Sequence, residues 1–202
     1  MLETLGAMGI VYLVVFILIG LTVHEFMHAY VGFMLGDNTA KEQGRISLNP
    51  IDHIDPVMTI GLPILTALLF GSPILAAKPV QFDPSRVRFG DLGAALVAFA
   101  GPLSNLAMAM FGAVLAGFVG LGAPLYMFIS LNVALFVFNL IPIPPLDGSR
   151  VLYAFMPESV RELMDQIEPY GIFIVFGLVL MGGFGGWLTG INSTILSLLG
   201  IN

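Results

Sequence analysis

Residues 13–35 have the sequence LVVFILIGLTVHEFMHAYVGFML, an apolar stretch that contains two histidines and a glutamate. Apolar residues extend it into one helix candidate over 5–35, and residues 5–23 carry no charged side chain. About 20 apolar residues cross the hydrocarbon core of a bilayer. The stretch therefore predicts a membrane-spanning helix with three ionisable side chains toward its far end.

The rest of the composition also indicates a membrane protein. Of 202 residues, 57% are hydrophobic and 10% are charged, and residues 92–146 and 169–202 contain no Asp, Glu, Lys or Arg. By length, the first of these stretches holds two spans and the second at least one. The net charge of −6 argues against a nucleic-acid partner, because phosphate contacts need a basic face. The absence of cysteine excludes disulfides and thiol chemistry.

These patterns predict an all-α polytopic membrane protein that forms a single membrane-embedded domain over 1–202. Gly and Pro breaks divide the apolar sequence into about four full transmembrane helices, a broken or re-entrant segment and a surface helix, and the polar loop is expected to be β-hairpin-like. The spans are 5–35, 92–119, 125–141 and 170–188, the re-entrant segment is 56–77, the surface helix is 157–168 and the hairpin-like loop is 37–53.

His24, Glu25 and His28 form an H-E-x-x-H motif. The two histidines are four residues apart, so a helix presents both imidazoles on one face to a single metal ion. Glu25 lies roughly 100° further round the helix and can reach a water without ligating the metal. Ionisable groups inside a membrane are costly and usually functional. We therefore interpret the motif as a zinc site with Glu25 as general base; the alternative is a histidine pair hydrogen-bonded within a helical bundle.

A catalytic zinc ion needs a third protein ligand and an open position for water. Asp147 is the first charged residue after 55 uncharged positions and follows the proline-rich turn NLIPIPPLDG. His53, in the polar stretch NPIDHIDP, is the competing candidate. Zn²⁺, two neutral imidazoles and the carboxylates of Asp147 and Glu25 sum to zero charge, which is the least costly cluster to hold at membrane depth. Charge balance therefore favours Asp147.

Two further motifs are open to more than one interpretation. Asn139 could donate to an oxyanion from the end of its span, or it could cap the carbonyl groups freed where the prolines end the helix. The motif GPLSN starts a ridge of Gly101, Asn105, Ala109 and Ala113 at intervals of four residues. Small residues at this spacing are typical of close helix packing in membranes. We interpret the ridge as structural, with the asparagine as a polar cross-link.

Together, HEFMH, GPLSN and NLIPIPPLDG, in this order, resemble the motifs of the site-2 protease family of intramembrane zinc metalloproteases. The resemblance covers residues 10–45 and 92–150, and the three motifs together are highly specific. It implies a zinc endopeptidase with one Zn²⁺ per chain that hydrolyses a transmembrane segment of a single-pass membrane protein. We accordingly expect a multi-pass protein in the lipid bilayer of a prokaryotic cell membrane, with the active site toward the cytoplasm and an oligomeric state that the sequence leaves open.

Residue by residue, the resemblance implies that His24, His28 and Asp147 bind zinc. It implies that Glu25 activates the water and that Asn139 lies beside the site. It also likens the polar loop to the re-entrant β region of the family, which is thought to hold an unwound substrate.

The loop contains a candidate substrate-binding strand. Gln43-Gly44 offers a turn, and GRISLNP over 44–50 is typical of a short strand that Asn-Pro closes. An extended peptide could pair with such a strand by β-augmentation. The candidate substrate-binding residues are Arg45, Ile46, Ser47 and Leu48.

Two departures from the family pattern leave substrate selection open. The chain has no room for the PDZ or CBS domains of many members, and the segment 56–77 has no counterpart in the three-helix core of the family, although shorter members have one. The alternatives to a protease are a metal or proton transporter and a catalytically silent binding homologue. A transporter would be expected to show internal repeats and more acidic residues at the midplane, and the motif of a silent homologue would be degraded. Neither pattern occurs here.

The seven basic residues predict the topology. If 56–77 dips into the membrane and returns, all seven face one side, whereas a full crossing divides them two against five. Cytoplasmic loops are enriched in Lys and Arg, so we favour re-entry, with both termini outside. The basic residues are Lys41, Arg45, Lys78, Arg86, Arg88, Arg150 and Arg161.

Overall fold

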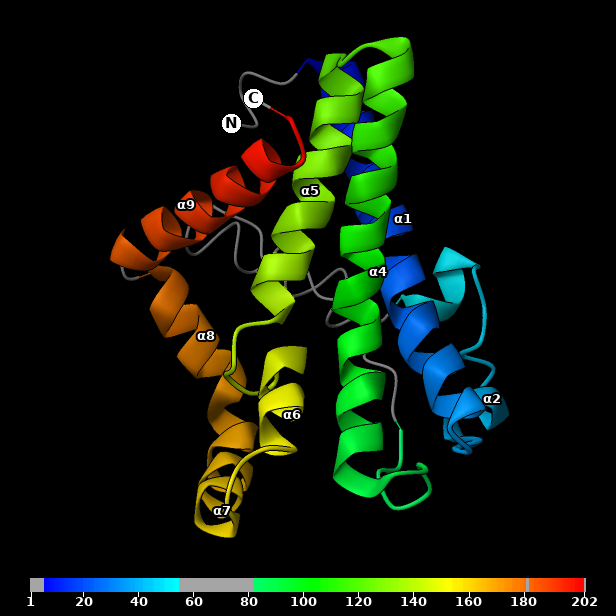
Figure 1. Ribbon diagram of the computed structural model, residues 1–202, viewed down its shortest axis with the longest axis vertical. Helices are drawn as coiled ribbons and strands as arrows, with labels where there is room; N and C mark the ends of the chain where they lie inside the picture. Colours follow the sequence, from blue (N-terminus) through cyan, green and yellow to red (C-terminus); the bar gives the residue numbers. More distant parts are fainter. Residues whose placement is uncertain (1–5, 55–81, 181, 202) are drawn as a thin grey trace.

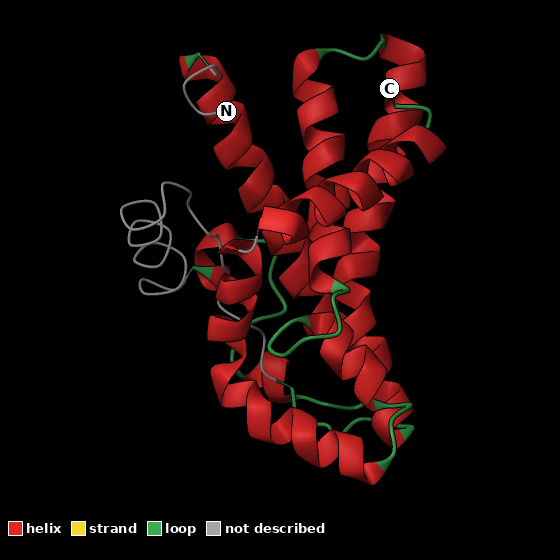
Figure 2. Cartoon of the chain, turned by 90° about the vertical axis from the view of Figure 1, so that its left-hand side faces the viewer, coloured by secondary structure: helices red, strands yellow, loops and turns green. Residues whose placement is uncertain are grey.

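The computed structural model describes residues 6–54, 82–180 and 182–201, and within these ranges the chain is helical and contains no strand (Figure 2). Three apolar helices carry the site: α1 (Ala7–Met34), α4 (Gly90–Val119) and α5 (Ala123–Asn139). Helix α4 packs against both of the others (Figure 1). The remaining elements are α2 (Thr39–Glu42), η2 (Pro50–His53), α6 (Asp147–Tyr153), α7 (Glu158–Ile167), η4 (Glu168–Tyr170), α8 (Gly171–Leu180) and α9 (Gly182–Leu198).

Helices α1 and α4 are each long and apolar enough to cross a membrane. Helix α5 is apolar but shorter, at 17 residues. Helices α7 to α9 reach that length and hydropathy only when taken together, as two segments with a bend of 85° at a short break. The described residues therefore supply two membrane-spanning helices, or three if the bent pair counts as one. The predicted number of four full spans stays a prediction.

The structure divides the predicted span 170–188 into two helices. Helix α8 ends at Leu180 and α9 begins at Gly182. Four glycines lie between 182 and 186, and each glycine in a helix interior costs about 1 kcal/mol relative to alanine. The glycine cluster therefore weakens the first turns of α9, directly after the end of α8. The other predicted boundaries agree closely with α1, α4, α5 and α7.

The predicted β-hairpin over 37–53 is not found, because these residues form the short helix α2, a turn and the 3₁₀ helix η2. The turn at Gln43-Gly44 is present, and Gly44 has a φ of +70°. Local hydrogen bonds replace strand pairing: Asn49 accepts from the Ile51 N–H, and the Arg45 guanidinium donates to the Asp52 carbonyl. The predicted strand therefore gives way to contacts within a few residues of one another.

The chain leaves α1 and enters α4 at the same end of the bundle. Gly36, with a φ of +108°, ends α1. The Arg88 N–H then donates to the Leu35 carbonyl at 2.8 Å, and the Asp83 N–H donates to Asp37 Oδ2 at 2.7 Å. These two bonds join the end of α1 to the stretch that precedes α4. The predicted re-entrant segment 56–77 lies outside the described residues.

Asp37 is the centre of this junction and is almost fully buried. It also accepts hydrogen bonds from the backbone N–H and the hydroxyl of Thr39. Burial raises the pKa of Asp37, but the hydrogen bonds from Thr39 and Asp83 outweigh it and hold the pKa below its usual value. The carboxylate is therefore ionised at neutral pH and ties α1 to the start of α4.

The predicted small-residue ridge is the packing face of α4. Gly101, Asn105 and Ala109 are all buried, and Ala113 is partly buried. Ala109 also belongs to an apolar core that joins α4, α5 and the C-terminal segment. That core consists of Ala109, Ile129, Val133, Val137, Leu196 and Ile201.

The six described Lys and Arg residues lie in connectors and short helices at the end of the bundle where α1 stops (Figure 1), and the re-entrant topology stays a prediction. The beginning of α1 and the end of α9 lie at the opposite end (Figure 1). Because the chain has no cysteine, single-cysteine variants can report the side of each connector.

We expect Lys41→Cys, Arg88→Cys and Glu162→Cys to react with an impermeant thiol reagent from one side of the membrane. Leu121→Cys, in the exposed turn between α4 and α5, should react from the other side. Labelling of intact cells and inverted vesicles measures this. Reaction of positions 41 and 88 from opposite sides would contradict the arrangement.

Candidate functional site

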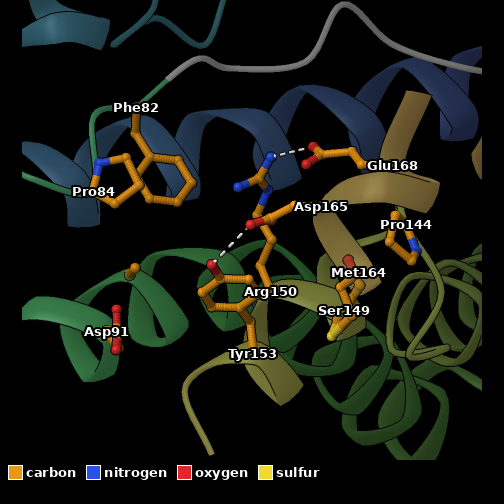
Figure 3. A pocket seen from close by; sticks show the side chains of 11 residues that line it. Phe82, Pro84, Asp91, Pro144, Ser149, Arg150, Tyr153, Met164, Asp165 and Glu168 are labelled. Atoms are coloured by element: carbon orange, nitrogen blue, oxygen red, sulfur yellow. Dashed lines mark hydrogen bonds and ion pairs between the residues drawn. The ribbon is translucent and has the colours of Figure 1, made fainter. Parts of the chain in front are cut away.

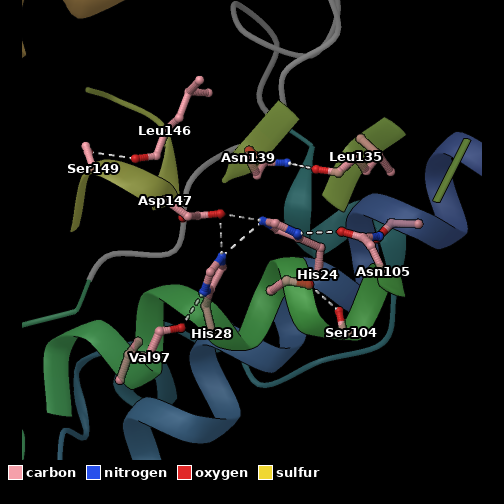
Figure 4. Close-up of polar contacts among 12 residues, drawn as sticks. His24, His28, Val97, Ser104, Asn105, Leu135, Asn139, Leu146, Asp147 and Ser149 are labelled. Carbon is pink, nitrogen blue, oxygen red and sulfur yellow. Dashed lines mark hydrogen bonds and ion pairs between the residues drawn. The ribbon is translucent and has the colours of Figure 1, made fainter. Parts of the chain in front are cut away.

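Helix α1 presents His24 and His28 together on the side that packs against α4. Their ring centroids are 4.6 Å apart and their Nε2 atoms are 3.0 Å apart. Both side chains are buried. The i, i+4 spacing therefore brings the two imidazole nitrogens to one point, as Figure 4 shows.

The turn after α5 brings Asp147 to this point. Asp147 is the first residue of α6, and its Oδ2 lies 3.1 Å from His24 Nε2 and 3.3 Å from His28 Nε2. Gly148 permits the tight turn, because a Cβ there would lie 2.2 Å from the carbonyl oxygen of Leu140. Within the described ranges, the two histidines and the aspartate form a group that could hold one metal ion.

The hydrogen bonds of the two histidines show which nitrogens are available to a metal. His24 Nδ1 lies 2.7 Å from Asn105 Oδ1, and His28 Nδ1 lies 2.7 Å from the Val97 carbonyl oxygen. Both partners are acceptors, so each ring donates from Nδ1, and the Nε2 atom of each ring is the one that faces Asp147. Asp147 Oδ2 is buried and has no hydrogen-bond donor. Two imidazole nitrogens and a carboxylate oxygen therefore converge on one point, an arrangement that a cation would stabilise.

The spacing of these three atoms fits zinc. Tetrahedral zinc with bonds of about 2.0–2.1 Å separates its ligand atoms by about 3.3–3.4 Å. The observed separations are 3.0, 3.1 and 3.3 Å. A metal-ligating histidine commonly donates its other N–H to a carbonyl or carboxylate, and both histidines do so here.

Gly101 lets α4 pass directly against the two imidazoles. A Cβ at this position would lie 2.3 Å from His28 Nε2 and 2.8 Å from His24 Cε1. Our structural interpretation of the GPLSN ridge was therefore incomplete, because Gly101 and Asn105 both contact the histidines. Sequence spacing could not show which residues lie across from α1. One general rule could have pointed to Asn105: each metal-ligating histidine needs a buried hydrogen-bond acceptor for its other ring nitrogen.

Gly101→Ala is expected to lower metal affinity by at least tenfold, because the added methyl group overlaps the position of the ligand nitrogens and the rings are held by their Nδ1 hydrogen bonds. Gly117→Ala is the matched control: it lies in the same helix, and a Cβ there meets nothing within 4 Å. Chelator competition with the two purified variants measures this. Equal metal affinity in both would show that the imidazoles can move away from α4.

Glu25 opens onto the same cavity as the metal group. The cavity has a volume of about 610 Å³, and its lining includes Glu25, His28 and Asp147. Loops and short helices contribute Thr39, Asp83, Arg86, Arg150 and Glu168 to the same lining. Glu25 itself is buried and is not among the three converging ligands. This placement suits a base that acts on a molecule held in the cavity.

A second cavity of about 250 Å³, drawn in Figure 3, shares lining residues with the first. Arg150 and Glu168 line both cavities, and their ion pair measures 2.6 Å. The two side chains are nearly half exposed, so the pair stabilises the fold by about 0–1 kcal/mol. Their main consequence is to place one charge of each sign on the shared wall.

Asn139 lies at the end of α5 (Figure 4), and its side-chain N–H donates to the Leu135 carbonyl at 3.0 Å. In this conformation the amide group bonds its own helix, as a cap would. Its role toward an oxyanion stays a prediction.

The structure places His53 away from the histidine pair, in η2. Its Nε2 donates to the Ser47 carbonyl at 2.8 Å, and its side chain is buried in the loop. The metal group therefore contains Asp147 and not His53. Nearby, Arg45 is buried and Leu48 is 60% exposed. Binding of substrate by Arg45, Ile46, Ser47 and Leu48 stays a prediction.

Comparisons with known proteins identify relatives over most of the chain. The model of peptidase family M50 matches residues 116–182, which include Asn139 and Asp147. The chain is 40% identical over 190 residues to "Putative zinc metalloprotease YwhC" of Bacillus subtilis, across 88% of this chain and 83% of the relative. It is 28% identical over 195 residues to "Putative zinc metalloprotease Rip2" of Mycobacterium tuberculosis, across 92% and 73%. No solved structure was found to match.

The names of these relatives agree with the metal-binding geometry of His24, His28 and Asp147. The Bacillus relative shares most of its length with this chain, and both kinds of relative carry the name of a zinc metalloprotease. The apolar helices α1 and α4 make the chain a membrane protein. The chain belongs to peptidase family M50, the site-2 protease family of membrane metalloproteases.

Proposed function

We propose that this chain, as one membrane-embedded domain, is a zinc endopeptidase that cleaves transmembrane segments of single-pass membrane proteins. One zinc ion per chain is held by His24, His28 and Asp147, and Glu25 is the general base. One observation carries the proposal: two imidazole nitrogens and a buried carboxylate oxygen converge within 3.3 Å beside a cavity that Glu25, His28 and Asp147 line.

The zinc ion, when bound, supplies a Lewis acid that activates water and polarises a peptide carbonyl. Glu25 accepts the proton of the attacking water and delivers it to the leaving nitrogen. Asn139 donates to the developing oxyanion once its amide turns from Leu135. Gly101 and the rest of α4 cover the opposite side of the imidazoles, so water and peptide reach the site through the cavity.

The substrate must unwind before it is cleaved, because a helix in lipid satisfies its peptide groups internally. The segment Arg45–Leu48 follows the turn at Gly44. We propose that it holds the unwound peptide by main-chain hydrogen bonds, with the exposed Leu48 beside an apolar side chain of the substrate.

The site faces the cytoplasm of a prokaryotic cell in this proposal. The cavity is lined by Thr39 of α2, Arg86 of the loop before α4 and Arg150 of α6, at the end of the bundle where the described basic residues lie. The relatives from Bacillus and Mycobacterium support a bacterial cell membrane as the location.

Removal and return of the metal test the proposed function. Purified protein reconstituted in liposomes should contain about one zinc ion per chain, as a single three-residue site requires. A zinc chelator should stop cleavage of a co-reconstituted single-pass protein, and added Zn²⁺ should restore it. Cleavage that persists after complete removal of zinc would contradict the proposal.

A further inference from the structure

Two buried asparagines connect His24 to the neighbouring helices. Asn105 on α4 and Asn132 on α5 are both fully buried. The amide nitrogen of Asn105 donates to the Gly20 carbonyl at 3.2 Å and to Asn132 Oδ1 at 3.1 Å, and its oxygen lies 2.7 Å from His24 Nδ1. Asn132 in turn donates to the Phe128 carbonyl at 2.9 Å. The hydrogen bonds therefore run from α5 through α4 to the imidazole on α1, and Figure 4 shows the last step.

Main-chain carbonyl groups determine which side-chain atoms donate and which accept in this series of hydrogen bonds. The Gly20 carbonyl can only accept, so the NH₂ group of Asn105 faces it and the oxygen of Asn105 faces His24. That oxygen can only accept, so His24 donates from Nδ1 and its Nε2 stays bare. Asn132 is oriented in the same way by Phe128 and presents its oxygen to Asn105. Backbone positions thus determine which nitrogen of His24 can bind a metal.

Close helix packing at Gly20 supports this arrangement of the two amides. A Cβ at Gly20 would lie 2.9 Å from Leu135 and 3.4 Å from Asn132 Oδ1. The glycine therefore lets α1 approach α5 closely enough for its carbonyl group to meet Asn105. The amide of Asn105 keeps one orientation, because turning it over would place its oxygen against the oxygens of Gly20 and Asn132.

We propose that Asn105, oriented by Gly20 and Asn132, is a positioning residue that sets the tautomer and ring orientation of His24 for metal binding. The inference rests on the proposed zinc site. The Nδ1 atom of His28 donates in the same way to the main-chain carbonyl group of Val97. No side-chain substitution removes that acceptor. Asn105 is therefore the residue at which the effect can be tested.

Zinc affinity, measured by chelator competition, separates positioning from packing. Asn105→Leu removes the acceptor and should lower zinc affinity by about 10–100-fold, the usual cost of losing such a partner. Asn105→Asp keeps an acceptor for His24 but loses both donations, so it should lower the thermal stability and retain zinc. Ser104→Ala, whose hydroxyl donates only within α4 to Gly101, is the control and should bind zinc as the unaltered protein does. Zinc affinity that follows thermal stability across the three variants would overturn the inference.

The tautomer itself can be observed without metal. The chain has three histidines, so nitrogen resonances of histidine-labelled protein can be assigned with single substitutions. His24 should be protonated at Nδ1 in the unaltered protein, and a second population protonated at Nε2 should appear in Asn105→Leu. Unchanged His24 resonances in that variant would contradict the inference. If the unaltered protein binds no zinc, the proposed function fails, whereas this measurement still decides what orients His24.

Discussion

Glu25→Gln is expected to abolish proteolysis and to leave the zinc ion bound. The substitution keeps the size of the side chain and removes its ability to accept a proton. General acid–base catalysis contributes about 10²–10⁴-fold to rate, so kcat should fall by about that factor. The three atoms of the metal group belong to His24, His28 and Asp147, so the metal content should stay near that of the unaltered protein. Metal analysis and a cleavage assay on the same preparation measure both quantities.

Glu168→Gln is the matched control for this substitution. Glu168 lines the same cavity and carries the same charge, but it pairs with Arg150 at the outer wall. It should retain zinc and most of the activity. Loss of zinc in Glu25→Gln would show that Glu25 is a ligand and would remove it from the role of base. With the metal kept and the base removed, Glu25→Gln should also retain uncleaved single-pass proteins in native membranes, which identifies substrates.

Features that depend on helical periodicity could be predicted from the sequence. The i, i+4 spacing places His24 and His28 together on any helix, whatever surrounds it. The long apolar stretches predict α1, α4 and α5 because each is bounded by glycine or proline. Asp147 was found through charge balance, which depends on the membrane and not on the fold. These parts of the site follow from local geometry and from the cost of charge in lipid.

Features that depend on how helices face one another could not be predicted. Gly101 and Asn105 lie on a small-residue ridge, and such a ridge has the same spacing whether it packs against leucines or against metal ligands. Only the packing of α4 on α1 shows that Asn105 meets His24. Asn132 carries no motif at all, and its role comes entirely from its position beside Asn105.

Competing local interactions explain why the predicted hairpin over 37–53 is not found. Between 37 and 53, polar side chains such as Asn49 and Arg45 bond nearby backbone groups, and these bonds replace the pairing that the strand pattern predicts. Between 170 and 188 the structure forms two helices, α8 and α9, and a single full span over these residues stays a prediction.

Asp147→Ala is expected to lower zinc affinity by several orders of magnitude, whereas His53→Ala should leave the zinc content near one per chain. The aspartate supplies the only carboxylate oxygen among the three converging atoms, 3.1 and 3.3 Å from the two imidazole nitrogens. Removing it leaves two ligands and an uncompensated positive charge at membrane depth, which is costly. His53 instead donates to the Ser47 carbonyl within its own loop and is buried there, so its loss should lower the folding stability and leave the metal bound.

Asp147→Asn separates the ligand role of this residue from its structural role at the start of α6. Asparagine is nearly isosteric and also suits the beginning of a helix, so the turn after α5 should be preserved, as circular dichroism and thermal unfolding can verify. The neutral amide oxygen binds zinc more weakly than a carboxylate, and the cluster gains a net positive charge, so zinc affinity should fall well below that of the unaltered protein. Full zinc content in Asp147→Asn and Asp147→Ala, together with loss of zinc in His53→Ala, would move the third ligand to His53 and bring the loop 37–53 into the active site.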